Sequence, residues 1–170
     1  LTQKAKACGL TVMHVVANVC QARRSEDSGV DIVICEGYEA GGIEGADEIT
    51  SMVLIPSVVQ AVSIPVVGAG GFGRGNGLIA ALALGAEGIQ MGSAFLATKE
   101  CHVHQNFKQA IVEADDTGTV MIQRMIGRLS RVIKTPRALQ FQDMDKRGAV
   151  DEMETLMAAA PSDANIEKAP

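Results

Sequence analysis

Short apolar runs alternate with amphipathic stretches along most of the chain. Thr11 to Ala17 is rich in β-branched residues and predicts a strand, and the polar stretch from Val19 to Ser28 predicts a helix. The same succession of strand and helix returns three times: Asp31 to Cys35 with Ser51 to Val62, Pro65 to Ala69 with Gly75 to Leu84, and Gly88 to Met91 with Asn106 to Ala114. Four successive βα units predict a parallel sheet covered by helices.

The fold class that follows is α/β, as either a doubly wound sheet or a (β/α) barrel, and hydrophobic periodicity does not separate the two. Glycines settle the choice, because they follow the carboxyl ends of three consecutive strands: Gly41 and Gly42, Gly70 and Gly71, and Gly92. In a (β/α)8 TIM barrel that rim carries the active site. A complete barrel has eight units and about 250 residues, so we expect a partial barrel of about four carboxyl-terminal βα units.

The domain boundaries are predicted from a change in composition. Residues 1–104 should form the carboxyl-terminal half of the barrel, and residues 105–160, which are polar and charged beyond Thr135-Pro136, a helical extension with one helix from Val150 to Ala159. Residues 161–170 are expected to be a disordered tail. The chain opens in amphipathic Leu1 to Gly9, which has the pattern of a helix already under way, so we expect a fragment of a longer enzyme.

Charge and cysteine content narrow the functional classes. The net charge is −5, without a block of Lys or Arg, which gives no electrostatic reason to bind nucleic acid or an anionic membrane. No apolar run reaches the roughly 20 residues of a membrane span. The four cysteines lack paired spacing, which suggests neither a zinc site nor a disulfide framework and fits a reducing, cytoplasmic location: Cys8, Cys20, Cys35 and Cys101. Small molecules are the expected partners.

Two glycine-rich loops carry the clearest chemical signal. They are Gly68 to Gly75 (GAGGFGRG) and Gly88 to Phe95 (GIQMGSAF), after what would be the last two strands of the barrel. Residues without a Cβ let the backbone approach an anion, so the N–H groups of Gly71, Gly92 and Ser93 are predicted to form a phosphate cup. The alternative is that these glycines only make tight βα turns.

Three stretches of the sequence resemble the nitronate monooxygenase family, once called 2-nitropropane dioxygenases, which is close to the FMN-dependent enoyl-ACP reductases. They are Asp31 to Gly45, which contains EGYEAGGIEG, then Pro65 to Gly71, and GAEGIQMGSAFLATKEC from Gly85 to Cys101. The resemblance implies FMN as the cofactor, with Gly71, Gly92 and Ser93 at its phosphate. It also implies further cofactor-binding residues, namely Gly41, Gly42, Gly70 and Gln90.

One position departs from the family pattern. The AGG run is normally followed by a histidine, the base that removes a proton beside the nitro group, and this sequence has Ile43 there. Isoleucine has no lone pair, so the catalytic residue is unknown. Glu44 is a candidate replacement, set against the simpler interpretation of a solvated loop carboxylate. A nitronate anion is already deprotonated and needs no base.

The resemblance therefore implies a flavin-dependent monooxygenase that oxidises alkyl nitronates with O2. One alternative is an NAD(P)H-dependent enoyl-thioester reductase that uses FMN. Another is an inactive half-barrel fragment that binds phosphate and pairs with the missing amino-terminal half of the barrel. A homo-oligomer stays open.

Among the remaining polar residues, His14 is interpreted as a buried, hydrogen-bonded histidine or one inside the barrel. His102 and His104 have an i, i+2 spacing without a visible further ligand, so no metal site is predicted. Asn18 follows the first strand, where it either reaches the rim or caps the helix that begins at Val19.

Overall fold

The structure is a computed structural model that describes residues 1–158 of the chain. Its residues group into two compact units, the first containing Leu1–Ala40 and Glu44–Gly92 and the second containing Gly41–Ile43 and residues 93–158. The expected tail at residues 161–170 lies outside the described residues.

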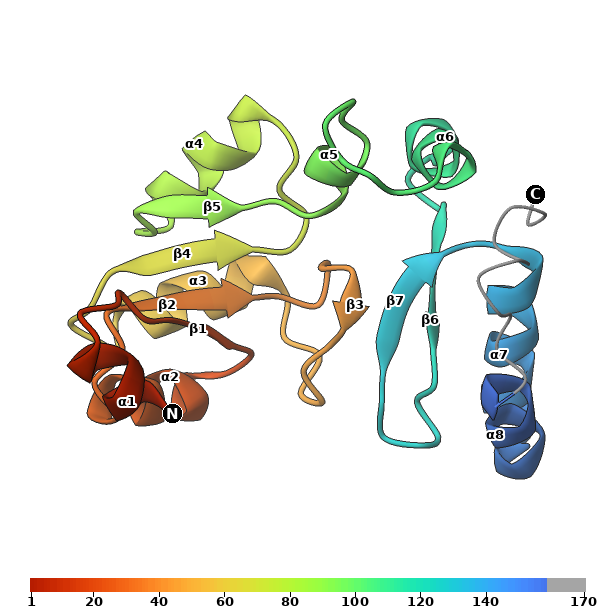
Figure 1. Cartoon of the computed structure of the whole chain (residues 1–170), viewed down its shortest axis with the longest axis horizontal. Coiled ribbons are helices and arrows are strands. Elements are labelled where there is room, and N and C mark those ends of the chain that lie inside the picture. Colours follow the sequence, from red (N-terminus) through yellow and green to blue (C-terminus); the bar gives the residue numbers. More distant parts are fainter. Residues whose placement is uncertain (159–170) are drawn as a thin grey trace. The chain divides into compact units, whose positions relative to one another are not determined.

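The first unit is built on a parallel sheet of four strands in the order β1-β2-β4-β5 (Figure 1). The strands are β1 (Met13–Val16), β2 (Ile32–Glu36), β4 (Val66–Ala69) and β5 (Gly88–Gln90). The ladders place Val16 of β1 opposite Cys35 of β2, and Glu36 of β2 opposite Ala69 of β4. Gln90 of β5 in turn lies opposite Ala69. The four predicted strands and their parallel arrangement are therefore confirmed.

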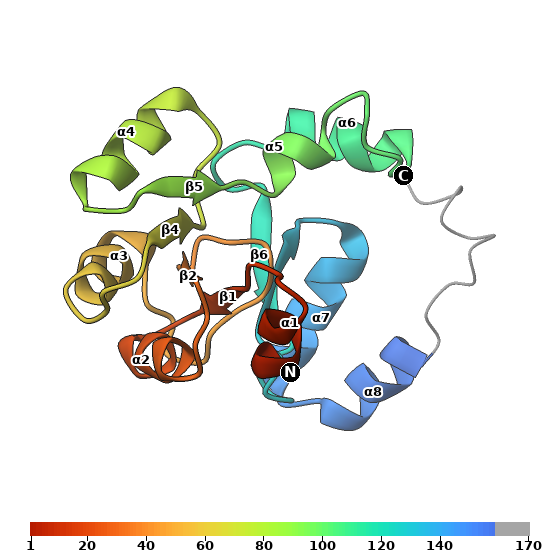
Figure 2. The same cartoon turned by 60° about the vertical axis from the view of Figure 1, so that its left-hand side comes forward.

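Three helices cover one face of this sheet (Figure 2). They are α2 (Val19–Asp27), α3 (Ser51–Val59) and α4 (Gly75–Ala83), and the short α1 (Thr2–Ala7) precedes β1. Val33 and Cys35 of β2 are fully buried in the core beneath the helices, together with Leu54 and Ile55 of α3. Alternation along β2 sends Val33 and Cys35 to the side of the helices and their neighbours in the strand to the other side.

The second face of the sheet, opposite α2, α3 and α4, carries the alternate residues of each strand. On β1 these are Met13 and Val15, which are 48% and 45% exposed although both are apolar. Parallel sheets are usually buried on both faces, because their strands are apolar on both sides. This face is the one that would line the interior of a closed barrel.

The second unit contains an antiparallel sheet of three strands in the order β3-β7-β6. Its strands are β3 (Gly42–Ile43), β6 (Thr119–Ile122) and β7 (Ser130–Ile133), and its helices are α5 (Ser93–Leu96), α6 (Gln105–Glu113), α7 (Pro136–Arg147) and α8 (Val150–Ala158). The buried side chains of β6 pack against α7 and α8 in a core of five residues: Val120, Ile122, Ala138, Phe141 and Met153.

These strands correct the prediction of a helical extension over residues 105–160. TVMI and SRVI are rich in β-branched residues, and the segment between them turns at Gly127, whose φ is +68°. The prediction extended the polar composition found beyond Thr135-Pro136 to the whole segment, whereas the hairpin lies before that point in a stretch with many apolar residues. The boundary between the two units also lies at Gly92 rather than at residue 104, and β3 joins the second unit because Ile43 pairs with Ser130 of β7.

No helix within residues 1–158 is long and apolar enough to cross a membrane.

Candidate cofactor site

The predicted phosphate loops follow β4 and β5 at the carboxyl edge of the parallel sheet. Gly70 and Gly71 leave β4 with φ of +93° and +79°, a conformation that glycine adopts without steric cost. Gly70 is also crowded, because a Cβ atom there would lie 2.7 Å from the carbonyl oxygen of Gly37. Glycine is therefore required for the chain to turn at this point.

The loop after β4 presents backbone donors to open space. The N–H groups of Gly71, Phe72 and Gly73 donate to no acceptor within residues 1–158. A Cβ atom built on Gly73 or on Gly92 would meet no atom within 4 Å. Unused N–H groups beside open space are what a phosphate group requires, so the residues present fit the phosphate of FMN.

Ser51, which sequence reasoning missed, ties these loops together. Its backbone N–H donates to Oε2 of Glu39 at 2.8 Å, and its hydroxyl oxygen lies 3.0 Å from the same atom. The hydroxyl also lies 3.1 Å from the carbonyl oxygen of Ala69 and 2.9 Å from that of Gly70. One hydroxyl hydrogen serves these acceptors in turn. Glu39 therefore caps the start of α3, and Ser51 joins the loop after β2 to the loop after β4.

Glu36 is the last residue of β2 and the first acidic residue of the EGYEAGGIEG run. Its side chain is half-buried, and this burial raises the pKa of the carboxyl group. Val33 and Cys35 point toward the helices, so Glu36 points to the second face of the sheet. Its carboxylate makes no hydrogen bond or ion pair within residues 1–158.

Glu44 does not have the environment that its sequence context suggested. It is only 8% exposed, so the interpretation as a solvated loop carboxylate is wrong. The next residue packs closely as well, because a Cβ atom on Gly45 would lie 2.3 Å from the Cβ of Ala17. Ile43, at the position of the family histidine, is 62% exposed.

The cofactor residues predicted from the resemblance divide between the two units. Four belong to the first unit: Gly70, Gly71, Gln90 and Gly92. The remaining three, which belong to the second unit, are Gly41, Gly42 and Ser93. Gly42 has a φ of +103°, which only glycine adopts readily, and Ser93 begins α5. Their contacts with FMN stay predictions.

The other candidate polar residues have structural roles. Asn18 caps α2, since its Oδ1 accepts from the N–H of Gln21 at 2.8 Å while its Nδ2 donates to Asp47 at 2.7 Å. The Nδ1 atom of His14 lies 3.3 Å from the hydroxyl of Ser25 on α2, although the residue is exposed rather than buried. Its orientation toward a helix argues against catalysis.

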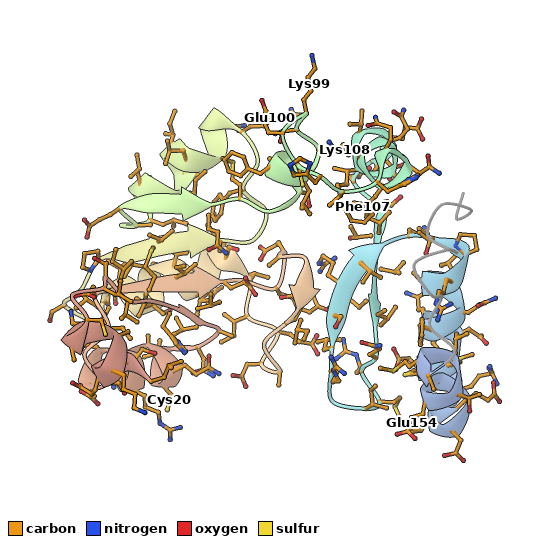
Figure 3. The ribbon with its side chains drawn as sticks, viewed as in Figure 1. Cys20, Lys99, Glu100, Phe107, Lys108 and Glu154 are labelled. Carbon is orange, nitrogen blue, oxygen red and sulfur yellow. The ribbon has the colours of Figure 1, made fainter. Side chains whose placement is uncertain are left out.

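In the second unit, His104 caps α6, because its Nδ1 accepts from the N–H of Asn106 at 3.1 Å. Lys108 of the same helix is buried and donates from Nζ to the carbonyl oxygen of Thr98 at 2.7 Å. Lys99, by contrast, extends away from the loop between α5 and α6 (Figure 3). Lys108 therefore anchors that loop to α6.

Comparison with known proteins relates the chain to a family of enzymes. The family profile of nitronate monooxygenases matches residues 1–168. The chain is 38% identical over 142 residues to a probable nitronate monooxygenase of Staphylococcus haemolyticus, covering 78% of this chain and 40% of that protein. A probable nitronate monooxygenase of Staphylococcus saprophyticus is 38% identical over 152 residues, with 84% and 43% covered. The chain thus spans less than half the length of these relatives.

Solved structures give the same result. FabK from Thermotoga maritima is 41% identical with a TM-score of 0.85, covering 91% of this chain and 49% of that one. Nitroalkane oxidase from Streptomyces ansochromogenes is 33% identical with a TM-score of 0.72, covering 82% and 42%. The predicted α/β fold of the TIM-barrel class is confirmed by these neighbours. The chain belongs to the nitronate monooxygenase family.

Proposed function

We propose that this chain forms part of an FMN-dependent oxidoreductase that oxidises alkyl nitronates with O2, and that its glycine loops hold the phosphate of the cofactor. The observation that carries the proposal is the set of unused N–H groups at Gly71, Phe72 and Gly73 after β4, together with the open backbone of Gly92 after the neighbouring strand β5. Membership of the nitronate monooxygenase family supports it. When bound, FMN supplies the redox chemistry.

The residues of this chain supply binding and orientation. The backbone donors after β4 would hold the phosphate, because aligned N–H groups form an anion site. Gln90 ends β5 with an exposed side chain, so its amide can hydrogen-bond a ring atom or a nitro oxygen. Ile43 cannot accept a proton, and a nitronate anion does not require it to.

The phosphate site is tested by adding a charge where a side chain fits. Gly92→Asp places a carboxylate in open space beside the loop, and Gly92→Ala adds only a methyl group. Two like charges about 4 Å apart near a protein surface repel by up to about 4 kcal/mol, so Gly92→Asp should weaken FMN binding at least tenfold more than Gly92→Ala. Fluorescence titration with FMN measures both dissociation constants. Equal dissociation constants for the two variants would place the phosphate elsewhere.

The reaction is tested on the purified flavoprotein by oxygen uptake with propyl nitronate. Uptake that saturates with substrate supports nitronate oxidation. Bound FMN without uptake would favour the NAD(P)H-dependent enoyl-thioester reductase, which is assayed by loss of NAD(P)H absorbance. A colourless protein that aggregates would favour the inactive half-barrel.

A further inference from the structure

Three side chains form a row across the second face of the parallel sheet, at its carboxyl edge. The ladders place Glu36 of β2 opposite Ala69 of β4, and Ala69 opposite Gln90 of β5. Neighbouring strands lie about 4.8 Å apart, so the Cα atoms of Glu36 and Gln90 are about 10 Å apart. Ala69 has the shortest side chain in the row. Ala69 is only 2% exposed, so the groups of this row that a small molecule can reach are the half-buried carboxylate of Glu36 and the exposed amide of Gln90.

Glu36 differs from the other two acidic residues of the EGYEAGGIEG run. Glu39 is occupied by the N–H and hydroxyl of Ser51, and Glu44 is almost fully buried. Glu36 is half-buried and has no hydrogen-bond or ion-pair partner within residues 1–158. It also stands directly before the loop of Gly37 to Gly45 and across from the strand that leads into Gly70. Catalytic residues of barrel enzymes come from the ends of strands in this way.

We propose that Glu36 is the base that removes the α-proton from a neutral nitroalkane, the role for which Ile43 has no suitable atom. The C–H bond beside the nitro group breaks, and its proton forms an O–H bond on the carboxylate of Glu36. The electron pair of the broken bond delocalises onto the nitro group, which gives the nitronate anion. The amide N–H groups of Gln90 stabilise the charge that develops on the nitro oxygens.

The environment of Glu36 suits this role. A base is most effective when its pKa lies near the working pH, and burial raises the pKa of Glu36 toward that range. On the flanking strands the second face presents only residues that do not titrate: Met13 and Val15 on β1, and Val67 and Ala69 on β4. Glu39 and Glu44 are the acidic groups of the adjoining loop. The proton transfer should therefore accelerate as pH rises through the raised pKa of Glu36.

The inference rests on the proposed function only for the substrate, and it can be tested without oxidation. The flavin-loaded protein is incubated with nitroethane in D2O without oxygen, and loss of the α-proton signal is followed by nuclear magnetic resonance. We expect Glu36→Gln to slow the catalysed exchange by about 10²- to 10⁴-fold, the usual contribution of a positioned base. Glu87→Gln, which changes an exposed carboxylate at the amino end of β5, is the matched control and should exchange at the wild-type rate.

Two further measurements separate the two hypotheses. Oxygen uptake with ethyl nitronate tests the proposed function, and Glu36→Gln should retain it within about twofold because the anion needs no base. Infrared difference spectra of the wild type and Glu36→Gln should contain a carboxyl band that titrates above the usual range of glutamate. Exchange that is absent in the wild type, or undiminished in Glu36→Gln, overturns the role of Glu36 even where nitronate oxidation persists. Exchange that depends on Glu36 in a protein without nitronate oxidation would overturn only the proposed function.

Discussion

Replacement of Gly70 by alanine should destabilise the first unit while leaving its core untouched. Gly70 has a φ of +93°, and its added Cβ would lie 2.7 Å from the carbonyl oxygen of Gly37, 3.0 Å from the hydroxyl of Ser51 and 3.1 Å from the backbone nitrogen of Ala40. A left-handed conformation costs an alanine about 1–2 kcal/mol. Overpacking against rigid backbone costs about 1–3 kcal/mol more.

One effect partly offsets these costs. Alanine has less conformational freedom than glycine in the unfolded chain, which stabilises the folded protein by about 0.4–1 kcal/mol. We therefore expect Gly70→Ala to lower the free energy of unfolding by about 2–4 kcal/mol. Gly73→Ala, in the same loop with no atom within 4 Å of its Cβ, is the matched control and should change that free energy by less than about 0.5 kcal/mol. Urea unfolding followed by circular dichroism measures both. Equal stability of the two variants would refute the crowding at Gly70.

Three other changes test the remaining contacts. Ser51→Ala should lower the free energy of unfolding by about 0.5–1.5 kcal/mol, because it removes the hydroxyl hydrogen bond while the carbonyl oxygen of Ala69 still accepts from the N–H of Gly37. An unchanged free energy of unfolding would show that the hydroxyl adds no net stability. Burial raises the pKa of Cys35 to about 12, so a thiol reagent should modify exposed Cys20 rapidly at neutral pH and Cys35 only after denaturation. Rapid labelling of Cys35 in the native protein would contradict this prediction. The pKa of Asp31 is lowered by hydrogen bonds from Lys6 and the N–H of Val12, so Asp31→Asn should be destabilising at neutral pH. The difference in stability between the two proteins should shrink as pH falls below the usual pKa of aspartate and through the lowered pKa of Asp31. A difference that does not depend on pH would rule out this linkage.

Hydrophobic pattern was sufficient for the parallel sheet and insufficient for the antiparallel one. In the first unit each strand and helix is a separate apolar run punctuated by glycine, so period and turn signals agree. The second unit depends on pairing between distant segments. β3 is two residues long, and Gly42 and Ile43 form a strand only because they meet Arg131 and Ser130 of β7. No pattern among neighbouring residues in the sequence predicts that pairing.

In the candidate site, too, the sequence predicted some residues and missed others. The glycine loops were predictable because glycines after consecutive strands are typical of the rim where barrels bind phosphate. Ser51 was not, since a serine at the start of a helix usually has only a local role, and here its hydroxyl lies within hydrogen-bonding distance of two carbonyl oxygens 18 and 19 residues away. Glu36 and Glu44 are both glutamates of one loop motif, and the sequence does not reveal that Glu44 is almost fully buried while Glu36 is only half-buried.

The packing of Gly37 against Ser51 limits which amino-acid substitutions position 37 can accept. A Cβ atom on Gly37 would lie 2.3 Å from both the hydroxyl oxygen and the backbone nitrogen of Ser51. A smaller residue at position 51 would remove the first obstacle and leave the second, so no compensating substitution there can make room for a side chain at position 37. We expect glycine at this position to be fixed across divergent relatives, whereas Gly73 and Gly88, which have space around them, can vary independently.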